Sequence, residues 1–448
     1  MLDKFFSLSE KGTNVRTEIV AGITTFMTMA YIIFVQPGVL SGKMFGMDTG
    51  MDFYAVMAAT CVAAALATLI MGLYANYPIA QAPGMGENFF FVFSVLGAAA
   101  ALPAVVAGET TAWQVALGVV FVAGVLFLIL SLLKVRQVII DAISPSMKNG
   151  IAAGIGLFIA FIGLQNAKVI VANPGTLVHL TDNLINRDVI TFIAVLGLTA
   201  ILFARKIKGS ILIGILAGLV LSLAMGWVKF EGIVGRPPSM GPTFLKMDLL
   251  HALAWKMWPC IIVFLYMDMF DTIGTLIGVA EQAGLMVDNK LPRAGRALVS
   301  DAIGTVAGAA MGTSTVTSFI ESATGVEHGG RTGLTSVATA ALFLVALFFG
   351  PLVGMVANHP AITAPALVLV GAMMMRNVVK IKWLDYTEAI PAFLILIGIP
   401  LTYSIADGLA WGFISYPFIK LLSGRGREVS WLMYILAVLF IARYCIKL

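Results

Sequence analysis

Three acidic residues stand inside apolar stretches of the chain, where a charge is costly. Asp268 and Asp271 lie three residues apart in IIVFLYMDMFDTIGTLIGVA, so on a helix they share one face. Glu321 follows GTSTVTSFI, a segment rich in Thr, Val and Ser. An ionised carboxylate at the bilayer centre costs about 2.5 to 3.5 kcal/mol on insertion scales, so such residues usually have a function.

Carboxylates at this depth favour solute binding and proton transfer. A carboxylate can accept hydrogen bonds from the N–H edge of a planar heterocycle, and it can change its protonation as a carrier turns from one side to the other. We therefore expect Asp271 and Glu321 to face each other in mid-bilayer, held away from water, and to couple transport to protons. A helix end near the headgroups is the alternative for Asp268, and a helix cap is the alternative for Glu321.

Two irregular segments are expected to position these acids. Residues 80–93 (AQAPGMGENFFFVF) place Pro and Gly where a helix should propagate, so their start is expected to be extended. Residues 312–325 (GTSTVTSFIESATG) favour a strand. Each segment follows the start of a longer apolar span by about 55 to 65 residues, which is the arrangement of an inverted repeat. In such repeats broken helices meet near the midplane and face the solute.

Composition places the whole chain in a membrane. Its 448 residues are 60% hydrophobic and 11% charged, and the mean hydropathy is +0.97. A span needs about 20 apolar residues, and such segments recur throughout. The expected spans are 17–36, 53–75, 81–98, 112–133, 148–167, 189–204, 209–228, 255–279, 295–312, 314–326, 334–357, 362–376, 386–404 and 406–421. Residues 429–446 either make a fifteenth crossing or lie against the membrane.

Basic residues predict the orientation of these fourteen crossings. The net charge of +5 comes from short Lys and Arg clusters between apolar runs, which indicates cytoplasmic loops and not nucleic-acid binding. With a cytoplasmic N-terminus, whose residues 1–12 are expected to form an interfacial helix, all these clusters lie inside. They are Lys4/Lys11/Arg16, Lys134/Arg136, Arg205/Lys206/Lys208, Lys290/Arg293/Arg296, Arg376/Lys380/Lys382 and Lys420/Arg425/Arg427.

Cysteine and histidine give no sign of a metal or disulfide. The three cysteines are widely separated in apolar sequence, and the four histidines lack metal-ligand spacing. We therefore expect no metal and no cofactor. An intramembrane aspartyl protease would typically need a Gly-x-Gly-Asp motif and a zinc protease a His-Glu-x-x-His motif, and the sequence contains neither. A transporter is thus favoured over an enzyme, and the paired broken spans favour it over a channel.

Several motifs, in order along the chain, resemble the azaguanine-resistance-type branch of the nucleobase–cation symporter family. They are VRTEIVAGITTFMTMAYIIFVQP, APGMGENFFF, FDTIGTLIGVAEQAGL, GTSTVTSFIES and GGRTGLT. The resemblance covers essentially the whole chain. It implies an all-α polytopic membrane protein of fourteen spans in two inverted seven-span repeats, with a core domain, a gate domain, and short strands in spans 3 and 10.

The same resemblance implies domain boundaries and a location. The cytoplasmic N-terminal segment is 1–14, the core halves are 15–134 (spans 1–4) and 255–358 (spans 8–11), and the gate halves are 135–254 (spans 5–7) and 359–448 (spans 12–14 with the C-terminal apolar segment). The protein is expected in the bacterial cytoplasmic membrane. Its expected partners are a purine nucleobase, protons and lipid, and a homodimer is compatible with this reading.

The resemblance also implies a substrate site. Asp271 and Glu321 match the acids that hold the base and couple its transport to protons. Phe319 matches an aromatic side chain that stacks on the base, although packing alone is its alternative reading. Further residues implied in the site are Thr25 and Phe26 in span 1, Asn88 and Phe89 at the span 3 strand, and Thr275 and Ser322.

Glu87 departs from the pattern, because an apolar residue is expected after Gly-Met-Gly. It is either a third deep acid that tunes proton coupling or, as we favour, a residue that faces solvent at the edge of the site.

Residues 312–315 and the Asp-Thr-Ile-Gly-Thr of residues 271–275 resemble the adenine-transporting members of the family more than the guanine and hypoxanthine transporters. The expected substrate is therefore adenine, or else guanine or hypoxanthine. The alternative solutes on this fold are a pyrimidine, xanthine or an inorganic anion. An anion carrier would be expected to replace one of the two acids, whereas this chain keeps both Asp271 and Glu321.

Overall fold

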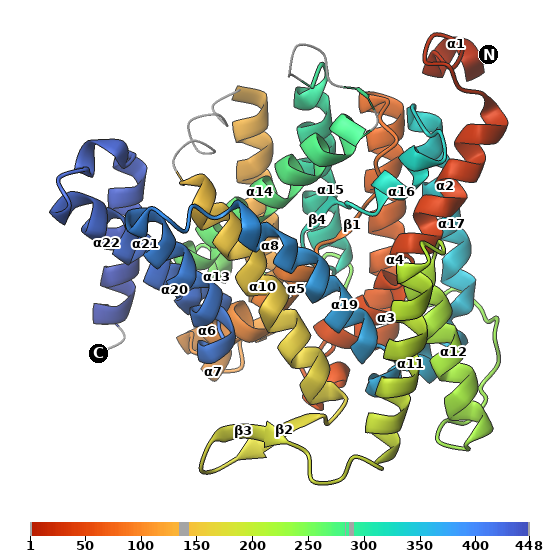
Figure 1. Cartoon of the computed structure of the whole chain (residues 1–448), viewed down its shortest axis with the longest axis horizontal. Coiled ribbons are helices and arrows are strands. Elements are labelled where there is room, and N and C mark those ends of the chain that lie inside the picture. The colour runs from red at the N-terminus through yellow and green to blue at the C-terminus, as the bar shows by residue number, and fades with distance from the viewer. Residues whose placement is uncertain (1, 134–142, 283, 286–290, 447–448) are drawn as a thin grey trace.

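The computed structural model describes residues 2–133, 143–282, 284–285 and 291–446. Within this part, eight helical segments are long and apolar enough to cross a membrane, and they coincide with predicted spans (Figure 1). They contain α2 (Val15–Met29) with α3 (Ile32–Leu40), α4 (Phe53–Ile70), α8 (Ala112–Leu133), α10 (Pro145–Asn166), α11 (Arg187–Ala204), α14 (Trp258–Gln282), α17 (Gly333–Ala346) with α18 (Gly350–Ala357), and α19 (Ala364–Met374).

Other helices occupy the remaining predicted spans and the C-terminal apolar segment. They are α5 (Met85–Phe90) with α6 (Leu96–Ala100), α12 (Ser210–Ala224), α15 (Ala294–Met311), α16 (Ser322–Glu327), α20 (Tyr386–Thr402), α21 (Ile405–Leu422) and α22 (Trp431–Ile446). The chain is therefore a helical, multi-pass membrane protein. The count of fourteen crossings stays a prediction, as does the role of α22. The boundary predicted between residues 134 and 135, and the basic residues Lys134, Arg136 and Lys290, lie outside the described residues.

Both irregular segments contain strands, which confirms the prediction of extended backbone in them. β1 (Gln81–Pro83) pairs antiparallel with β4 (Val316–Ser318). β1 leads into α5, and β4 is followed by α16. A second hairpin, β2 (Ile170–Asn173) and β3 (Leu177–Leu180), lies in a loop at the bottom of Figure 1 and was not predicted.

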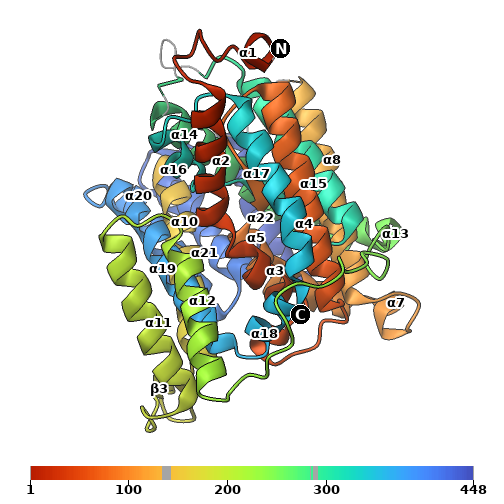
Figure 2. The ribbon, with the colours of Figure 1, turned by 90° about the vertical axis from the view of Figure 1, so that its right-hand side faces the viewer.

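The helices form two groups. In Figure 2, α11, α12, α19 and α20 lie on the left, and α4, α8, α15 and α17 lie on the right. Within the first group α10 packs against α19 and α20, and α20 packs against α21. Within the second group α8 packs against α15 and α14, while α4 packs against α15 and α17. The paired strands β1 and β4 belong to the second group, because α4, α14 and α15 surround them.

Close backbone approach holds the first group together. A Cβ atom at Gly156 of α10 would lie 2.8 Å from the carbonyl oxygen of Gly371 in α19. Only glycine leaves room for this crossing, and small residues at a helix interface allow such contact within a membrane.

A buried carboxylate joins α2 to α17. Glu18 is fully buried, and its side chain accepts hydrogen bonds from Thr335 Oγ1 (2.6 Å), Thr332 Oγ1 (2.8 Å) and the backbone N–H of Arg331 (2.8 Å). These donors stand at the start of α17, where backbone N–H groups lack partners within the helix. Glu18 thereby fixes the first span to the start of α17.

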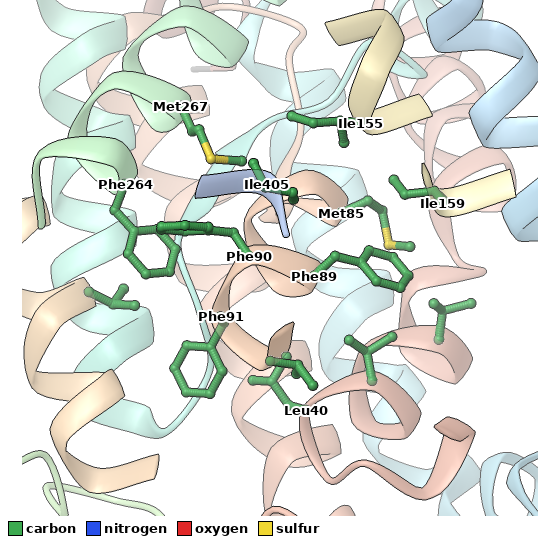
Figure 3. Close-up of a cluster of buried hydrophobic side chains, with 14 of the residues drawn as sticks. Leu40, Met85, Phe89, Phe90, Phe91, Ile155, Ile159, Phe264, Met267 and Ile405 are labelled. Carbon is green, nitrogen blue, oxygen red and sulfur yellow. The ribbon is translucent and has the colours of Figure 1, made fainter. Parts of the chain in front are cut away.

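An apolar cluster fills the space between the two groups. Phe89, Phe90 and Phe91 of the α5 region are all fully buried. Figure 3 shows Phe90 against Phe264 of α14, while Phe89 and Met85 point toward Ile159 of α10. The helix that follows β1 therefore makes apolar contact with both groups.

The N-terminal helix is shorter than predicted. α1 covers Leu2–Phe6, and Phe6 and Leu8 are buried against Leu334 of α17. The helix expected over residues 1–12 therefore ends at Phe6, and its position at the membrane interface stays a prediction.

Candidate functional site

The two strands cross at the centre of the candidate site. Their ladder continues on each side, since Phe319 N–H donates to the Ala80 carbonyl (2.9 Å) and Gly84 N–H donates to the Thr315 carbonyl (3.0 Å). All strand residues are buried. Non-helical backbone at this depth is tolerated only where protein or a cavity surrounds it.

Asp271 lies on α14 at the level of the strands. The neighbouring Thr272 hydroxyl shares a 2.7 Å hydrogen bond with the Thr317 hydroxyl of β4, which fixes this turn of α14 to the strand pair. Asp271 itself is exposed. On the same face, one turn on, a Cβ added at Gly274 would meet nothing within 4 Å among the described residues, and at Gly278 it would meet only Ile320.

The expected shielding of Asp271 from water is therefore wrong for this conformation. The glycines at 274 and 278 carry no side chain that could cover the carboxylate. Ile320, which a Cβ at Gly278 would meet, is itself 45% exposed. The result is an open face in the last third of the predicted span 255–279, next to the strand crossing.

Glu321 lies immediately after β4 and is half-buried. The hydroxyl of Tyr31 donates a 2.9 Å hydrogen bond to its Oε1 atom. Tyr31 stands in the break between α2 and α3. Asp271 and Glu321 are close enough for their charges to act on each other. The structure thus brings together the two acids named from sequence, one open and one anchored.

Other predicted site residues surround β4. Phe319 is buried at the end of the strand, and Thr275 is buried one turn after Asp271. Ser322 is fully buried, and its hydroxyl accepts a hydrogen bond from the backbone N–H of Ala80 (3.0 Å). Ser322 therefore braces the strand crossing.

The span 1 residues lie beside the acids but pack against helices. Thr25 is fully buried, and its Oγ1 atom has no hydrogen-bond partner among the described residues. A Cβ at Gly325 of α16 would lie 2.2 Å from that atom. The Phe26 ring meets Phe343 of α17 edge to face at 5.2 Å.

The span 3 residues occupy another environment. Asn88 is fully buried and hydrogen-bonds to Gln36 of α3 and to Ser314. Phe89 stacks parallel to Phe93 at 6.2 Å and meets Phe158 of α10 edge to face. In the structure both residues therefore pack between elements, and their side chains do not join Asp271 and Glu321.

Glu87 is buried, 2% exposed, so the favoured expectation that it faces solvent is wrong. The reason is that every residue from 81 to 90 is enclosed. Its carboxyl group folds back over Gly84, where a Cβ would lie 2.2 Å from Glu87 Oε2.

Sequence reasoning missed two residues and undervalued a third. Tyr31 and Asp301 were not singled out, and Asp268 was given a helix end near the headgroups as an alternative. That alternative is wrong, because Asp268 is 2% exposed within α14 and accepts a hydrogen bond from Thr305 (2.8 Å). Asp301 is fully buried in α15. The available signal was an acid inside the apolar run RALVSDAIGTVAGAAM.

Two surface hollows lie on other elements. One, of about 430 Å³, is beside Leu102 and His251, and one of about 570 Å³ is beside Trp383. Neither hollow is lined by a predicted site residue. The candidate site is therefore the strand crossing with its acidic side chains.

Comparison with known proteins gives consistent matches over nearly the whole chain. The model of a family described as the permease family matches residues 16–410. A Methanocaldococcus jannaschii protein described as a permease is 51% identical over 99% of this chain and 98% of its own. The guanine/hypoxanthine permease PbuG of Bacillus subtilis is 46% identical over 98% of each chain. The adenine permease AdeP of Escherichia coli is 43% identical over 99% of this chain and 96% of its own.

Solved structures share the fold at low identity. The transmembrane domain of the cyanobacterial bicarbonate transporter BicA superimposes with a TM-score of 0.65 at 16% identity, over 88% of this chain and 97% of that one. The anion transporter family member SLC26A9 gives a TM-score of 0.64 at 11% identity, over 91% of this chain and 65% of that one. The chain therefore shares the fold of these two membrane proteins.

Proposed function

The chain belongs to the permease family, and from that premise we propose that it imports purine nucleobases across the cytoplasmic membrane by proton symport with alternating access. It is a transporter and not an enzyme, since its relatives are permeases and its fold is a transporter fold. Relatives named as adenine or guanine/hypoxanthine permeases are 40 to 46% identical to it over nearly their full length, which supports the purine substrate.

The observation that carries the proposal is an open carboxylate beside an anchored one. Asp271 is accessible on α14, and Glu321 is held by Tyr31 at the end of β4. Two carboxylates offer acceptors to the N–H groups on the edge of a purine. Phe319 is proposed to stack on the base. Thr275 and Ser322 complete the immediate surroundings. Four residues of spans 1 and 3 are proposed to shape the site indirectly, by packing between the helices that surround it. They are Thr25, Phe26, Asn88 and Phe89.

Proton coupling is proposed to act through Asp271 and Glu321. Two ionised carboxylates near each other repel, so either a proton or the hydrogen-bond donors of a bound base would stabilise the pair. Loading and release of the proton would then alternate with loading and release of the base. This would link accumulation to the proton gradient.

We further propose fourteen spans in two inverted repeats, with the N-terminus in the cytoplasm. Segment 1–14 leads into core halves 15–134 and 255–358, and the gate halves are 135–254 and 359–448. Reciprocal packing supports this division. α8 and α4 of the first core half pack on α15 and α17 of the second, and β1 pairs with β4. The two gate halves also pack on each other. α10 packs on α19 and α20, and α11 packs on α19.

Uptake of radiolabelled adenine, guanine, hypoxanthine and uracil, in cells that lack their own permeases, tests the substrate class. We expect adenine to be preferred, with guanine and hypoxanthine next. Uptake of uracil alone, or transport of an inorganic anion without any purine uptake, would overturn the proposal.

Three variants test the site in the same cells. Asp271→Asn and Glu321→Gln should each reach the membrane and lose purine uptake, because each removes an acceptor for the base. Asp182→Asn, in an exposed loop, is the matched control and should transport normally. Undiminished uptake by either site variant would remove that residue from the site. Uptake that survives collapse of the proton gradient but requires sodium would reject proton symport.

A further inference from the structure

A second acidic pair lies behind the strand crossing. Asp268 of α14 and Asp301 of α15 are 2% and 0% exposed. Their side chains are close enough to hydrogen-bond to each other when one of them is protonated. They are joined to the strands and not to the open face that exposes Asp271. The pair is therefore distinct from the acids assigned to the base.

Each carboxyl group has one satisfied and one unsatisfied oxygen. Asp268 Oδ2 accepts from Thr305 Oγ1 (2.8 Å). Asp301 Oδ1 accepts from Gln81 Nε2 (2.7 Å) and from Ser318 Oγ (3.2 Å). Asp268 Oδ1 and Asp301 Oδ2 are buried and have no hydrogen-bond partner among the described residues. The pair therefore lacks donors for its two remaining oxygens.

A third acceptor points to the same deficit. Gln81 is fully buried. Its Nε2 atom donates to Asp301, while its Oε1 atom lacks a partner within the described part of the chain. An unpartnered buried amide oxygen beside two unpartnered carboxyl oxygens marks a place that accepts a positively charged or donating ligand.

The part of the chain that the structure describes supplies no cation at this place. The ion pairs formed by the described residues involve other acids than Asp268 and Asp301. The other charged groups that act on the pair are acids, namely Asp271 on the same helix and Glu87 on α5. Two ionised carboxylates in contact in a dry space would repel each other strongly.

We propose that Asp268 and Asp301 form a proton-binding site in which one proton is shared between the two carboxyl groups. A proton on either carboxyl group donates a hydrogen bond to the other, so one proton satisfies both unpartnered oxygens at once. The pair then carries one negative charge, which Thr305, Gln81 and Ser318 stabilise through the hydrogen bonds described above. Such a pair takes up and releases its protons as a unit.

The site is built into the strand crossing. Gln81 and Ser318 are cross-strand partners of β1 and β4, and Thr305 hydrogen-bonds to both the N–H and the carbonyl group of Val316 in β4. Thr272, next to Asp271 on α14, hydrogen-bonds to Thr317 of the same strand. Loss of the shared proton would therefore disturb the contacts that position Asp271. The coupling to transport rests on the proposed function, whereas the proton site itself does not.

Infrared spectroscopy of the purified protein tests the proton site without any transport. A protonated buried carboxyl group gives a C=O band separate from that of carboxylates. We expect wild-type protein to show this band at neutral pH, with loss of the component assigned to the pair in Asp268→Asn and Asp301→Asn. The control Asp182→Asn should keep it. A band unchanged in both pair variants would overturn the proposal.

A variant that keeps both carboxyl groups tests the proton site even if the Asp→Asn variants do not fold. Ser318→Ala removes one donor to Asp301, and donors favour the ionised form. The band of the pair should therefore persist to higher pH in this variant than in wild type. An identical pH midpoint would contradict the shared site. If sodium chloride, compared with choline chloride at equal ionic strength, abolishes the band of the pair in wild type, the site binds sodium and not a proton.

Reconstituted vesicles test the coupling. Asp301→Asn should still exchange labelled purine for unlabelled purine across the membrane, because exchange needs no net proton movement. It should lose accumulation driven by a pH gradient. Full gradient-driven accumulation by this variant would overturn the coupling role. If wild type exchanges no purine at all, the proposed function fails, while the infrared result still decides the proton site.

Discussion

At the scale of single residues, Tyr31 is the contact that anchors Glu321. It is buried, and its hydroxyl is the donor to Glu321 Oε1 at 2.9 Å. A hydrogen bond to a charged group contributes about 1.5 to 3 kcal/mol. Its position in the break between α2 and α3 ties the geometry of the first span to the carboxylate at the end of β4.

Removing this hydroxyl should weaken purine binding. We expect Tyr31→Phe to raise the KM for purine uptake about tenfold or more, since about 1.4 kcal/mol corresponds to a factor of ten. The KM and maximal rate of uptake are compared with those of Tyr386→Phe, a change at an exposed tyrosine. A wild-type KM in Tyr31→Phe would show that this hydrogen bond does not position Glu321 for the base.

His359, which follows α18, forms a buried chain of hydrogen bonds. Its Nδ1 atom pairs with Ser222 Oγ (3.1 Å), and its Nε2 atom pairs with Asp188 Oδ1 (2.9 Å). The order of groups resembles a hydrolase triad, but Ser222 and His359 are 0% and 3% exposed, which leaves no path for a substrate. Burial lowers the pKa of His359, with Arg187 and Lys168 acting in the same direction and Asp188 opposing them.

This lowered pKa predicts acid sensitivity. In the unfolded chain a histidine binds its proton at about pH 6.5, whereas the folded protein binds it only at lower pH. The stability contributed by neutral His359 is therefore complete above about pH 6.5 and decreases as the pH falls below it. Melting temperatures in detergent should decrease less steeply with acidification in His359→Gln than in wild type. His179→Gln, on the β3 hairpin, should keep the wild-type slope.

At the scale of elements, the contact between α2 and α16 positions the second acid. Gly325 lies one turn after Glu321, and a Cβ there would lie 2.2 Å from Thr25 Oγ1 and 2.6 Å from the Ala21 carbonyl oxygen. Because backbone cannot move aside as a flexible side chain can, only glycine permits this distance between the helices.

Gly325→Ala should push α16 away from α2. We expect a loss of about 1 to 3 kcal/mol of stability from overpacking and a loss of purine uptake, because Glu321 moves with α16. Gly97→Ala is the matched control, since a Cβ at this helical glycine meets nothing within 4 Å among the described residues. It should be neutral or stabilising by up to about 1 kcal/mol. Equal melting temperatures and uptake for the two variants would contradict this account.

At the scale of the whole molecule, α5 contacts both helix groups, so transport is expected to require movement at this contact. A Cβ at Gly86 would lie 3.2 Å from Ile155 Cγ2 of α10. Cγ2 is bonded to Cβ, so the Cβ atoms of the two positions lie near the range of about 3.5 to 4.5 Å that is usual for a disulfide between cysteines.

A disulfide across this contact should stop transport reversibly. The double variant Gly86→Cys/Ile155→Cys should lose purine uptake after oxidation and regain it after reduction. Ile155→Cys alone should be insensitive to both treatments, because the thiols of Cys61 and Cys260 are buried. Continued uptake by the oxidised double variant, with the bond verified by mass spectrometry, would argue against relative movement of the two groups at α5.

The sequence by itself determined the membrane class, the positions of the apolar helices and the two extended segments. These depend on local properties. Hydropathy over about 20 residues defines a span, and Pro83, Gly84 and the β-branched run before Glu321 disfavour helix within the segments that contain them. The family also followed from motif order, because the motifs named extend along almost the whole chain.

Only the tertiary structure decided which side chains share an environment. Asp268 and Asp271 are three residues apart, yet their environments differ. Asp268 is buried against Thr305 of α15, whereas Asp271 is exposed beside β4. The environment of Asp301 became apparent only from its hydrogen bond to Gln81, which lies 220 positions away in the chain. Glu87 is likewise enclosed. Burial of a polar group depends on what packs over it, and periodicity along one helix cannot supply that information.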